Sequence, residues 1–266
     1  MSKKLMGLMI VLSIVLGAST SCLAGSGETA FSTPTMGPLY GTPPFEYIDN
    51  WALSVVFKTE PEVLKELVPE PLEPSPEGIM VMQISRFFVS GFGNYNEMIL
   101  FTPATYKGKV GNYSVCLMLD NDIAFAAGRE IWGFPKKIAD VSLEEKDGVI
   151  TGTVKRGNRV LVKTSMQIGP LGKPSDAAGS ATYYNLKLVP SVEKGGPPEV
   201  KQLTSTTLEN VELKKIYKDR GQSTLEFGKS PADPFQNIPV VEVVDGFYVS
   251  SDFDLVWGKV IHDYLE

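Results

Sequence analysis

Short runs of β-branched, aromatic and apolar residues, separated by turn residues, limit most strongly how this chain can fold. Two turn signals, Asp147-Gly148 and Gly157-Asn158, are of the kind that closes two-residue β-hairpins. They separate three strand-like runs at 138–145, 149–156 and 159–167. We therefore expect consecutive antiparallel hairpins in the middle of the chain.

Similar runs recur along the rest of the chain, with two short helices between them. The first helix is expected after Thr59, a plausible N-cap, with Pro61 in its first turn. The second is expected at 123–130, capped by Asn121 or Asp122. The sequence thus predicts an α+β fold, mainly antiparallel β with a few short helices. The further strands are expected at 51–59, 79–90, 98–103, 113–119, 182–189, 202–217, 223–227 and 240–251, with a loop at 169–180.

The N-terminus has the three parts of a secretory signal peptide. A positive start with Lys3 and Lys4 precedes an apolar run at 5–18, and small residues follow up to Ala24. The run is short for a membrane span, which needs ~20 residues, so we favour cleavage after Ala24 over a retained anchor. Lipidation at Cys22 is the second route. We expect an exported protein, secreted or periplasmic, with no stable membrane span after processing.

Three segments follow from this organisation. Residues 1–24 are expected to be the signal peptide, and residues 25–46 form an irregular N-terminal arm rich in Gly, Pro, Ser and Thr. Residues 47–266 are expected to form one domain, since no internal repeat or low-complexity block interrupts them.

Charge and rare residues argue against several classes of function. The net charge is −6, whereas nucleic-acid binders normally carry a basic surface, so we expect no nucleic-acid partner. The only histidine is His262, which argues against most zinc sites and Ser-His-Asp triads. The two cysteines are Cys22, inside the signal, and Cys116. If the signal is removed together with Cys22, only Cys116 remains, and its apolar run favours a buried structural thiol.

The segment at 128–137, which reads GREIWGFPKK, carries the strongest chemical signal. A lysine amine is nucleophilic only when neutral, and burial or a neighbouring cation lowers a lysine pKa from its free value of ~10.4. Here Trp132 and Phe134 offer an apolar surrounding for Lys136, and Lys137 offers the neighbouring charge. A neutral Lys136 would attack a ketone and form an imine. A solvated surface pair of lysines is the other interpretation of the same residues.

This segment resembles the Schiff-base motif of the acetoacetate decarboxylases, in which GRE is followed by an aromatic residue, Pro and two lysines. Further similar pieces lie at 68–73, 119–121, 184–190 and 261–265, so the resemblance covers most of the chain from about Gly41. Activation of a lysine by its surroundings is a known property of that family and is not deduced from this sequence.

The resemblance implies a fold, a reaction and an assembly. The sheet is expected to close into a cone- or barrel-like shell around the lysine, in a homo-oligomer. Lys136 is expected to form an imine with a β-keto acid, acetoacetate or a relative, with Lys137 as its charged neighbour. The resemblance implies that the reaction needs no metal and no cofactor. Glu97 matches an acidic residue of the family's site and would assist proton transfer or position the substrate. Taken alone, Glu97 could equally be a solvated carboxylate at the end of a strand.

The sequence also departs from the family at two positions. Counting without gaps from Val68, the family's site arginine falls at Asn50 and a second family glutamate falls at Met82. Arg86, on the same strand face as Met82, is a possible carboxylate-binding replacement, with the alternative that it points to solvent. The expected substrate-binding residues are Arg86, Tyr95, Met82, Trp132 and Phe134.

Three functions compete at this point. The first is decarboxylation of a β-keto acid through an imine on Lys136. The second keeps the imine but changes the reaction to an aldolase or dehydratase type, which the departures at Asn50 and Met82 favour. The third is an exported binding protein for a small carbonyl or carboxylate ligand.

Overall fold

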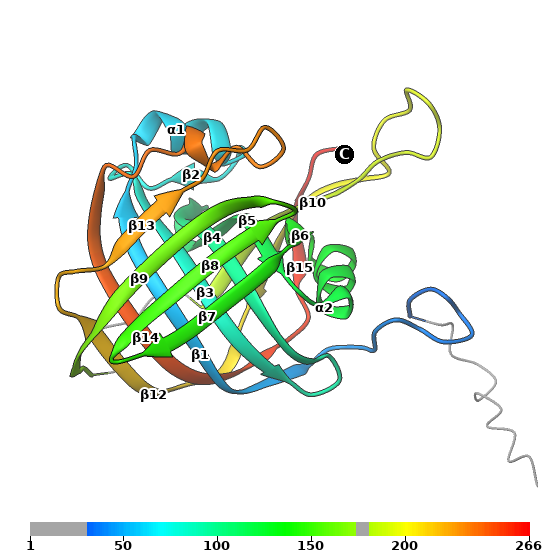
Figure 1. Cartoon of the computed structure of the whole chain (residues 1–266). Coiled ribbons are helices and arrows are strands. Elements are labelled where there is room, and N and C mark those ends of the chain that lie inside the picture. The colour runs from blue at the N-terminus through cyan, green and yellow to red at the C-terminus, as the bar shows by residue number, and fades with distance from the viewer. Residues whose placement is uncertain (1–30, 174–180) are drawn as a thin grey trace, which may run out of the picture.

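The computed structural model describes residues 31–173 and 181–266 (Figure 1). The signal peptide expected at 1–24 and the start of the expected arm lie outside the described residues. Among the described residues, no helix is both long and apolar enough to cross a membrane. The elements are β1 (Phe45–Lys58), α1 (Pro61–Leu67), β2 (Glu73–Pro74), β3 (Ile79–Val89), β4 (Gly93–Tyr106), β5 (Lys109–Leu119), α2 (Asp122–Ala127), the π-helical segment η1 (Gly128–Trp132), β6 (Lys136–Ile138), β7 (Asp140–Lys146), β8 (Val149–Arg156), β9 (Arg159–Leu171), β10 (Thr182–Val189), β11 (Val200–Thr207), β12 (Glu209–Asp219), β13 (Thr224–Phe227), the 3-10 helix η3 (Phe235–Asn237), β14 (Glu242–Leu255) and β15 (Lys259–Asp263).

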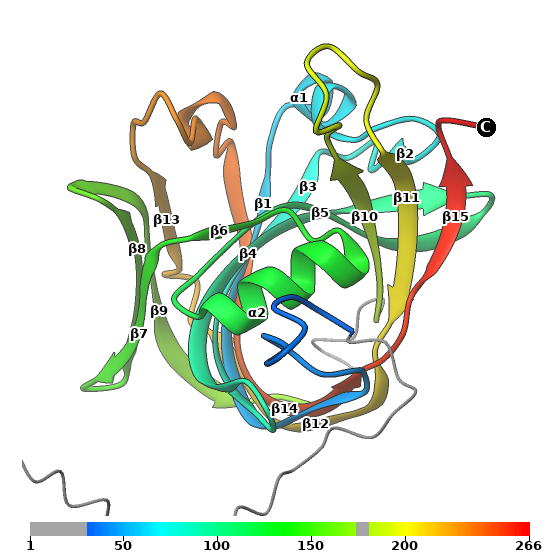
Figure 2. The same ribbon diagram turned by 90° about the vertical axis from the view of Figure 1, so that its right-hand side faces the viewer.

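One strongly curled sheet of 15 strands dominates the structure (Figures 1 and 2). Its main path runs β15-β11-β10-β5-β4-β3-β1-β14-β12-β9-β8-β7, and the pairs are antiparallel except β5 with β10 and β5 with β6. α2 lies across the concave side of this sheet (Figure 2). The predicted α+β fold, mainly antiparallel with short helices, is confirmed. The expected cone- or barrel-like shell is present as a strongly curled sheet. Among the described residues its path ends at β7 and β15, which are not paired with each other, so the sheet is not closed into a barrel by strand pairing.

The two central hairpins form as the sequence predicts. Asp147 and Gly148 both adopt positive φ, 52° and 76°, which is what a two-residue type I′ turn requires. This turn pairs Lys146 with Val149, and the next turn pairs Arg156 with Arg159. Because a two-residue turn sets the strand register, the local sequence was enough to predict this part of the sheet.

Two helix ends differ from prediction in instructive ways. Thr59 does not cap α1: Glu60 occupies the N-cap without a side-chain hydrogen bond, and the Thr59 amide instead donates to the Gly78 carbonyl at 2.8 Å. Asn121 does cap α2, since its side-chain oxygen accepts from the Ala124 amide at 2.8 Å. The α-helix ends at Ala127, and the chain continues directly into the π-helical segment η1. The predicted helix at 123–130 is therefore helical throughout, but its second part is a π-helix.

The predicted strand at 202–217 is in fact two strands interrupted at Leu208. β11 pairs with β10 and β15, whereas β12 pairs with β14 and β9, so the chain passes here between distant parts of the sheet. The predicted loop at 169–180 starts later than expected, because β9 continues to Leu171. β15 was not predicted, since its short and partly polar sequence has no clear alternation.

The two faces of the sheet bury two different cores. One face packs against β7, β8 and β9 and is aliphatic, with Leu53, Met82 and Ile150 fully buried in it. The other face is covered by α2 and is rich in aromatic side chains, among them Tyr95 and Phe134. Since side chains alternate between faces along a strand, odd and even positions of β3 and β4 enter different cores. The aromatic core contains the candidate site.

We predict that Ile150→Ala lowers the free energy of unfolding by about 2–5 kcal/mol, because it leaves a cavity in the aliphatic core. The measurement is urea denaturation followed by circular dichroism. Val192→Ala is the control, since Val192 is 97% exposed and should change stability by no more than about 0.5 kcal/mol. Equal losses in both variants would contradict the assignment of Ile150 to a packed core.

Candidate functional site

A cavity of about 100 Å³ opens on the aromatic side of the curled sheet. Its polar lining comes from Asn50, Gln83, Glu97, Lys136 and Ser251, which lie on β1, β3, β4, β6 and β14. Half of its apolar lining is aromatic, from Tyr47, Phe87, Phe134, Tyr183 and Phe253, and the other half is aliphatic, from Ala52, Ile99, Leu117, Leu208 and Leu255. Such a mixture of apolar surface with a few convergent polar groups is typical of small-molecule sites.

Lys136 lies in this cavity with only 5% of its surface exposed. β6 pairs in parallel with β5, opposing Lys136 to Leu117, and so directs the lysine to the aromatic side. Its Nζ lies 3.0 Å from Glu97 Oε1, within ion-pair distance but without hydrogen-bond alignment. The same atom is 5.9 Å from the centre of the Tyr95 ring and 5.8 Å from that of Phe134. A primary amine is therefore held in a desolvated surrounding beside one carboxylate.

The segment η1 supports the lysine from behind. A Cβ atom at Gly128 would lie 2.5 Å from Lys136 Cε, which is closer than side chains tolerate, so only glycine leaves room for the lysine stem here. Arg129 donates from Nη1 to the Lys136 carbonyl at 3.2 Å. Glu130 accepts a hydrogen bond from the Tyr40 hydroxyl and does not line the Lys136 cavity. Gly128 and Arg129 of the GRE motif thus help to position Lys136.

Glu97 is the acidic partner of this amine, and only 2% of its surface is exposed. Burial raises the pKa of Glu97 above its ordinary value, and the nearby charge of Lys136 opposes that rise. Tyr95 lies two residues before Glu97 on the same face of β4, and its hydroxyl is 3.1 Å from the Tyr47 hydroxyl. A carboxyl group whose pKa is raised can exchange protons with a neighbouring amine.

Lys137 does not lie beside Lys136 as the expected charged neighbour. It follows Lys136 in a strand and points to the opposite face, where its Nζ is 2.7 Å from Asp233 Oδ1. Arg156 donates to the same carboxylate at 2.9 Å. The side chain of Lys137 is 40% exposed, and its charge is balanced by Asp233. The two lysines therefore have separate surroundings.

Met82 and Arg86 do not reach the cavity either. Met82 is fully buried in the aliphatic core, and Arg86 is exposed and donates to the Leu143 carbonyl at 2.6 Å. The residue of β3 that lines the cavity is Gln83, one position after Met82. Counting without gaps missed it because a shift of one residue in a strand exchanges the two faces.

Two amide side chains line the cavity, and one of them, Asn50, stands where the family's site arginine was expected to fall. The Asn50 amide donates to the Ser251 carbonyl at 3.1 Å and accepts from the Phe88 amide at 3.0 Å. Gln83 donates to Ser85 Oγ at 2.8 Å and accepts from Ser54 Oγ at 3.3 Å. Among the described residues, the charged groups that line the cavity are Lys136 and Glu97, and no guanidinium does so.

Trp132 stands behind the cavity wall and does not line it. Its ring is 6.1 Å from that of Phe134, which does line the cavity, and its indole N–H donates to the Val256 carbonyl at 2.9 Å. Tyr95 also lies behind the wall, against Lys136 and Glu97. The aromatic and polar residues from β10 and β14, such as Tyr183 and Ser251, were not predicted, because only the sheet topology brings them to the site.

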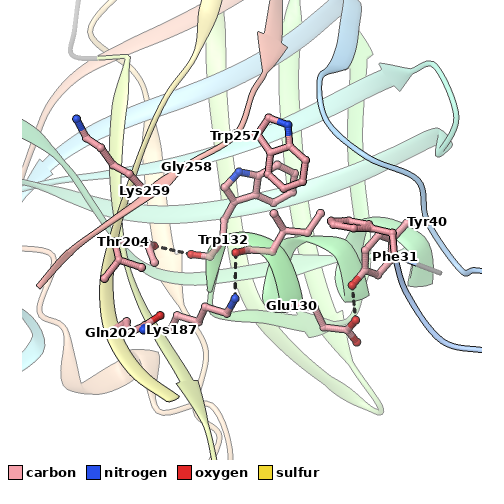
Figure 3. Close-up of a pocket in the computed structure, with 12 residues that line it drawn as sticks. Phe31, Tyr40, Glu130, Trp132, Lys187, Gln202, Thr204, Trp257, Gly258 and Lys259 are labelled. Atoms are coloured by element: carbon pink, nitrogen blue, oxygen red, sulfur yellow. Dashed lines mark hydrogen bonds between the residues drawn. The ribbon is translucent and has the colours of Figure 1, made fainter. Parts of the chain in front are cut away.

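A second cavity, of about 310 Å³, has Trp132 in its lining (Figure 3). It contains Lys187, whose Nζ donates to the Ile131 carbonyl at 3.3 Å and whose pKa is lowered by burial. Its rim carries the half-exposed Trp257 and the exposed Lys259. Glu130, also in this cavity, accepts from the Tyr40 hydroxyl (Figure 3). No amine–carboxylate pair comparable to Lys136 and Glu97 is found here, so the smaller cavity remains the candidate site.

We predict that the charges of Lys136 and Glu97 offset each other's cost of burial. Glu97→Gln leaves the Lys136 ammonium buried without a carboxylate and should lower the free energy of unfolding by about 3–5 kcal/mol. Glu97→Gln/Lys136→Met removes both charges and should recover at least half of that loss. Urea denaturation at neutral pH measures all variants.

The control is Glu62→Gln, which breaks the exposed pair between Glu62 and Lys65 and should have no measurable effect. A double variant as unstable as Glu97→Gln alone would show that the two charges do not compensate each other.

Comparison with known proteins identifies relatives along nearly the whole chain. The family model described as "Acetoacetate decarboxylase (ADC)" matches residues 30–265. Acetoacetate decarboxylase 2 of Mesorhizobium japonicum is 34% identical over 240 residues, which cover 89% of this chain and 90% of the relative. Acetoacetate decarboxylase of Ralstonia nicotianae is 33% identical over 244 residues, covering 90% and 96%.

Solved structures give the same result for the fold. The crystal structure of acetoacetate decarboxylase from Legionella pneumophila superposes with a TM-score of 0.82 at 28% identity, covering 91% of this chain and 99% of that chain. The enduracididine biosynthesis enzyme MppR, complexed with pyruvate, superposes with a TM-score of 0.79 at 16% identity, covering 90% and 100%. At that identity the second likeness concerns the fold alone.

Proposed function

This chain belongs to the acetoacetate decarboxylase family of enzymes, and from that premise we propose that it decarboxylates acetoacetate or a related β-keto acid through an imine on Lys136. The observation that carries the proposal is the buried Lys136 amine, 3.0 Å from the Glu97 carboxylate in an aromatic cavity. The third hypothesis, a binding protein without catalysis, is set aside because the family consists of enzymes.

The first half of the reaction forms the imine. Glu97 takes a proton from the Lys136 ammonium, and the neutral amine attacks the ketone carbon of the substrate. Glu97 then returns the proton to the leaving hydroxyl, and water departs. This leaves a positively charged iminium at Nζ beside an ionised Glu97.

The second half breaks the carbon–carbon bond. The electron pair of that bond moves into the iminium, CO₂ leaves, and a neutral enamine remains. The enamine carbon takes one proton, and water hydrolyses the resulting iminium to the ketone and Lys136. The net reaction consumes one proton from solvent. We assign its storage to Glu97, because burial raises the pKa of this carboxyl group.

The aromatic walls favour loss of CO₂. A carboxylate is costly to hold in a desolvated cavity, and decarboxylation replaces it with a neutral molecule. Tyr47, Phe134 and Phe253 provide such walls around Lys136.

A second reaction on the same imine has one observation in its favour. No guanidinium among the described residues lines the cavity to hold a substrate carboxylate. A Schiff-base aldolase or dehydratase acting on a keto acid would use the same Lys136 and Glu97 without releasing CO₂. Export of the protein and assembly into a homo-oligomer remain predictions beside either reaction.

We predict that borohydride added with acetoacetate traps a reduced adduct on Lys136, detected by peptide mass spectrometry, with parallel release of CO₂. Lys136→Ala should abolish both signals, because no other amine lies in this cavity among the described residues. Lys137→Ala is the matched control and should keep the adduct, since Lys137 pairs with Asp233 on the opposite face.

The outcomes separate the hypotheses. An adduct without CO₂ would contradict decarboxylation of acetoacetate and support another Schiff-base reaction. The absence of an adduct from folded protein with acetoacetate and a panel of keto acids would contradict the imine itself.

We also predict an acidic limb in the pH dependence of kcat/KM. The free enzyme needs ionised Glu97 to accept the Lys136 proton, so activity falls as pH drops through the pKa of Glu97. Because this pKa is raised, the limb should lie above the ordinary glutamate value of ~4.3. Glu97→Gln should lower kcat/KM by about 10²-fold or more and remove the limb. The same limb persisting in Glu97→Gln would assign it to another group.

A further inference from the structure

Two tyrosine hydroxyls extend the Lys136–Glu97 pair into a longer chain of buried polar groups. Tyr95 lies on β4 two positions before Glu97, so the two side chains share one face of the strand beside Lys136. The Tyr95 hydroxyl lies 3.1 Å from the hydroxyl of Tyr47 on β1. Tyr47 and Tyr95 are both buried, with 4% of their surface exposed, but Tyr47 lines the cavity and Tyr95 does not. The chain therefore starts at the Lys136 nitrogen and returns to the cavity at Tyr47.

The position of the Tyr47 hydroxyl is fixed by packing. Its ring stacks on Phe253, with centroids 4.5 Å apart and planes within 15°, and meets Phe87 edge to face at 5.2 Å. Phe87 packs in turn against Tyr95 at 5.3 Å. Rings held in this way have little rotamer freedom, so the distance between the two hydroxyls is set by the aromatic core.

We propose that Tyr47 is the residue that hands the proton to the enamine carbon, and that Tyr95 relays this proton from Glu97. The Oε1 atom of Glu97 faces the nitrogen, since it lies 3.0 Å from Nζ. The enamine carbon is a different atom of the bound substrate and requires a donor at a different place on the cavity wall. The proposal rests on the proposed function, since it concerns one step of that reaction.

The protonation state of Glu97 sets the direction of the hydrogen bonds in this chain. An ionised carboxylate only accepts, so Tyr95 donates to Glu97 and Tyr47 donates to Tyr95. A protonated Glu97 donates to Tyr95, Tyr95 donates to Tyr47, and the O–H of Tyr47 turns toward the cavity. Either hydroxyl can be the donor at the observed distance. Tyr47 is thus presented as a donor only when Glu97 holds the proton that the reaction consumes.

The transfer balances in protons. Tyr47 gives its proton to the enamine carbon, Tyr95 gives its proton to Tyr47, and Glu97 gives its proton to Tyr95. One proton leaves Glu97, one carbon–hydrogen bond forms, and the enamine becomes an iminium. The hydrogen bonds then point again toward the ionised carboxylate. Burial raises the pKa of both tyrosines, so neither needs to persist as a phenolate.

The experiment separates proton delivery from imine formation. Tyr47→Phe and Tyr95→Phe keep the packed rings but remove one hydroxyl each. We expect each to lower kcat by about 10²-fold and to leave KM and borohydride trapping on Lys136 within about threefold of wild type. Each should also suppress the enzyme-catalysed exchange of acetone methyl hydrogens in D₂O, which reports enamine protonation directly. The double variant should be no slower than either single one, because both hydroxyls serve one path.

Tyr184→Phe is the matched control. Its buried hydroxyl donates to the Lys109 carbonyl at 2.9 Å, in a separate core, so its loss should leave kcat and exchange unchanged. Wild-type kcat and exchange in Tyr47→Phe would overturn the relay. So would a loss in Tyr95→Phe alone, since the proton would then pass without Tyr47.

A measurement without substrate tests the chain independently of the proposed reaction. Infrared titration of the Glu97 carboxyl group, identified by its absence in Glu97→Gln, should show a higher midpoint in Tyr95→Phe, because the carboxylate loses a donor. A smaller rise is expected in Tyr47→Phe. Unchanged midpoints in both variants would overturn the hydrogen-bonded chain even if Lys136 forms the imine. Absence of an adduct with shifted midpoints would contradict only the reaction.

Discussion

The buried pair of Lys136 and Glu97 is the interaction on which the site depends. Desolvating one charge alone is costly, and these two groups, 5% and 2% exposed, compensate each other only at short range. β5 holds them there: Leu119 opposes Glu97 on one side and Leu117 opposes Lys136 on the other. A one-residue slip in either ladder would send one charge into the aliphatic core. The curled sheet therefore fixes the chemistry through strand register.

What the sequence predicted of the fold was set by local interactions. The residues Asp147 and Gly148 themselves favour the positive φ angles that their turn requires, and β8 begins and ends at its two flanking turns. The break at Leu208 and the strand β15 depend instead on which distant strands are available for pairing. No local preference marks such positions, because the strand partners lie far away in sequence.

The site was likewise predictable only as far as local sequence and the family resemblance determine it. The motif at 128–137 identified Lys136, and the family resemblance identified Glu97, which the structure brings together. Met82 was one residue away from the cavity-lining Gln83. The sequence holds one signal for the difference, since Gln83 is a polar residue between Met82 and Ile84, which are fully buried in the aliphatic core. Lys137 was misplaced for the related reason that adjacent strand residues point apart.

The charges in the cavity also explain how the proposed reaction proceeds without a guanidinium in its lining. The resting pair is neutral overall, and a β-keto acid brings one negative charge into it. If Glu97 takes up the proton that the reaction consumes, the iminium and the substrate carboxylate neutralise each other, and the buried charge returns to zero. Loss of CO₂ leaves a neutral enamine beside a neutral Glu97, and proton delivery restores the ion pair. Since a buried isolated charge is penalised at every step, the proposed reaction assigns to protonation of Glu97, which burial favours by raising its pKa, the part that a fixed cation would otherwise take.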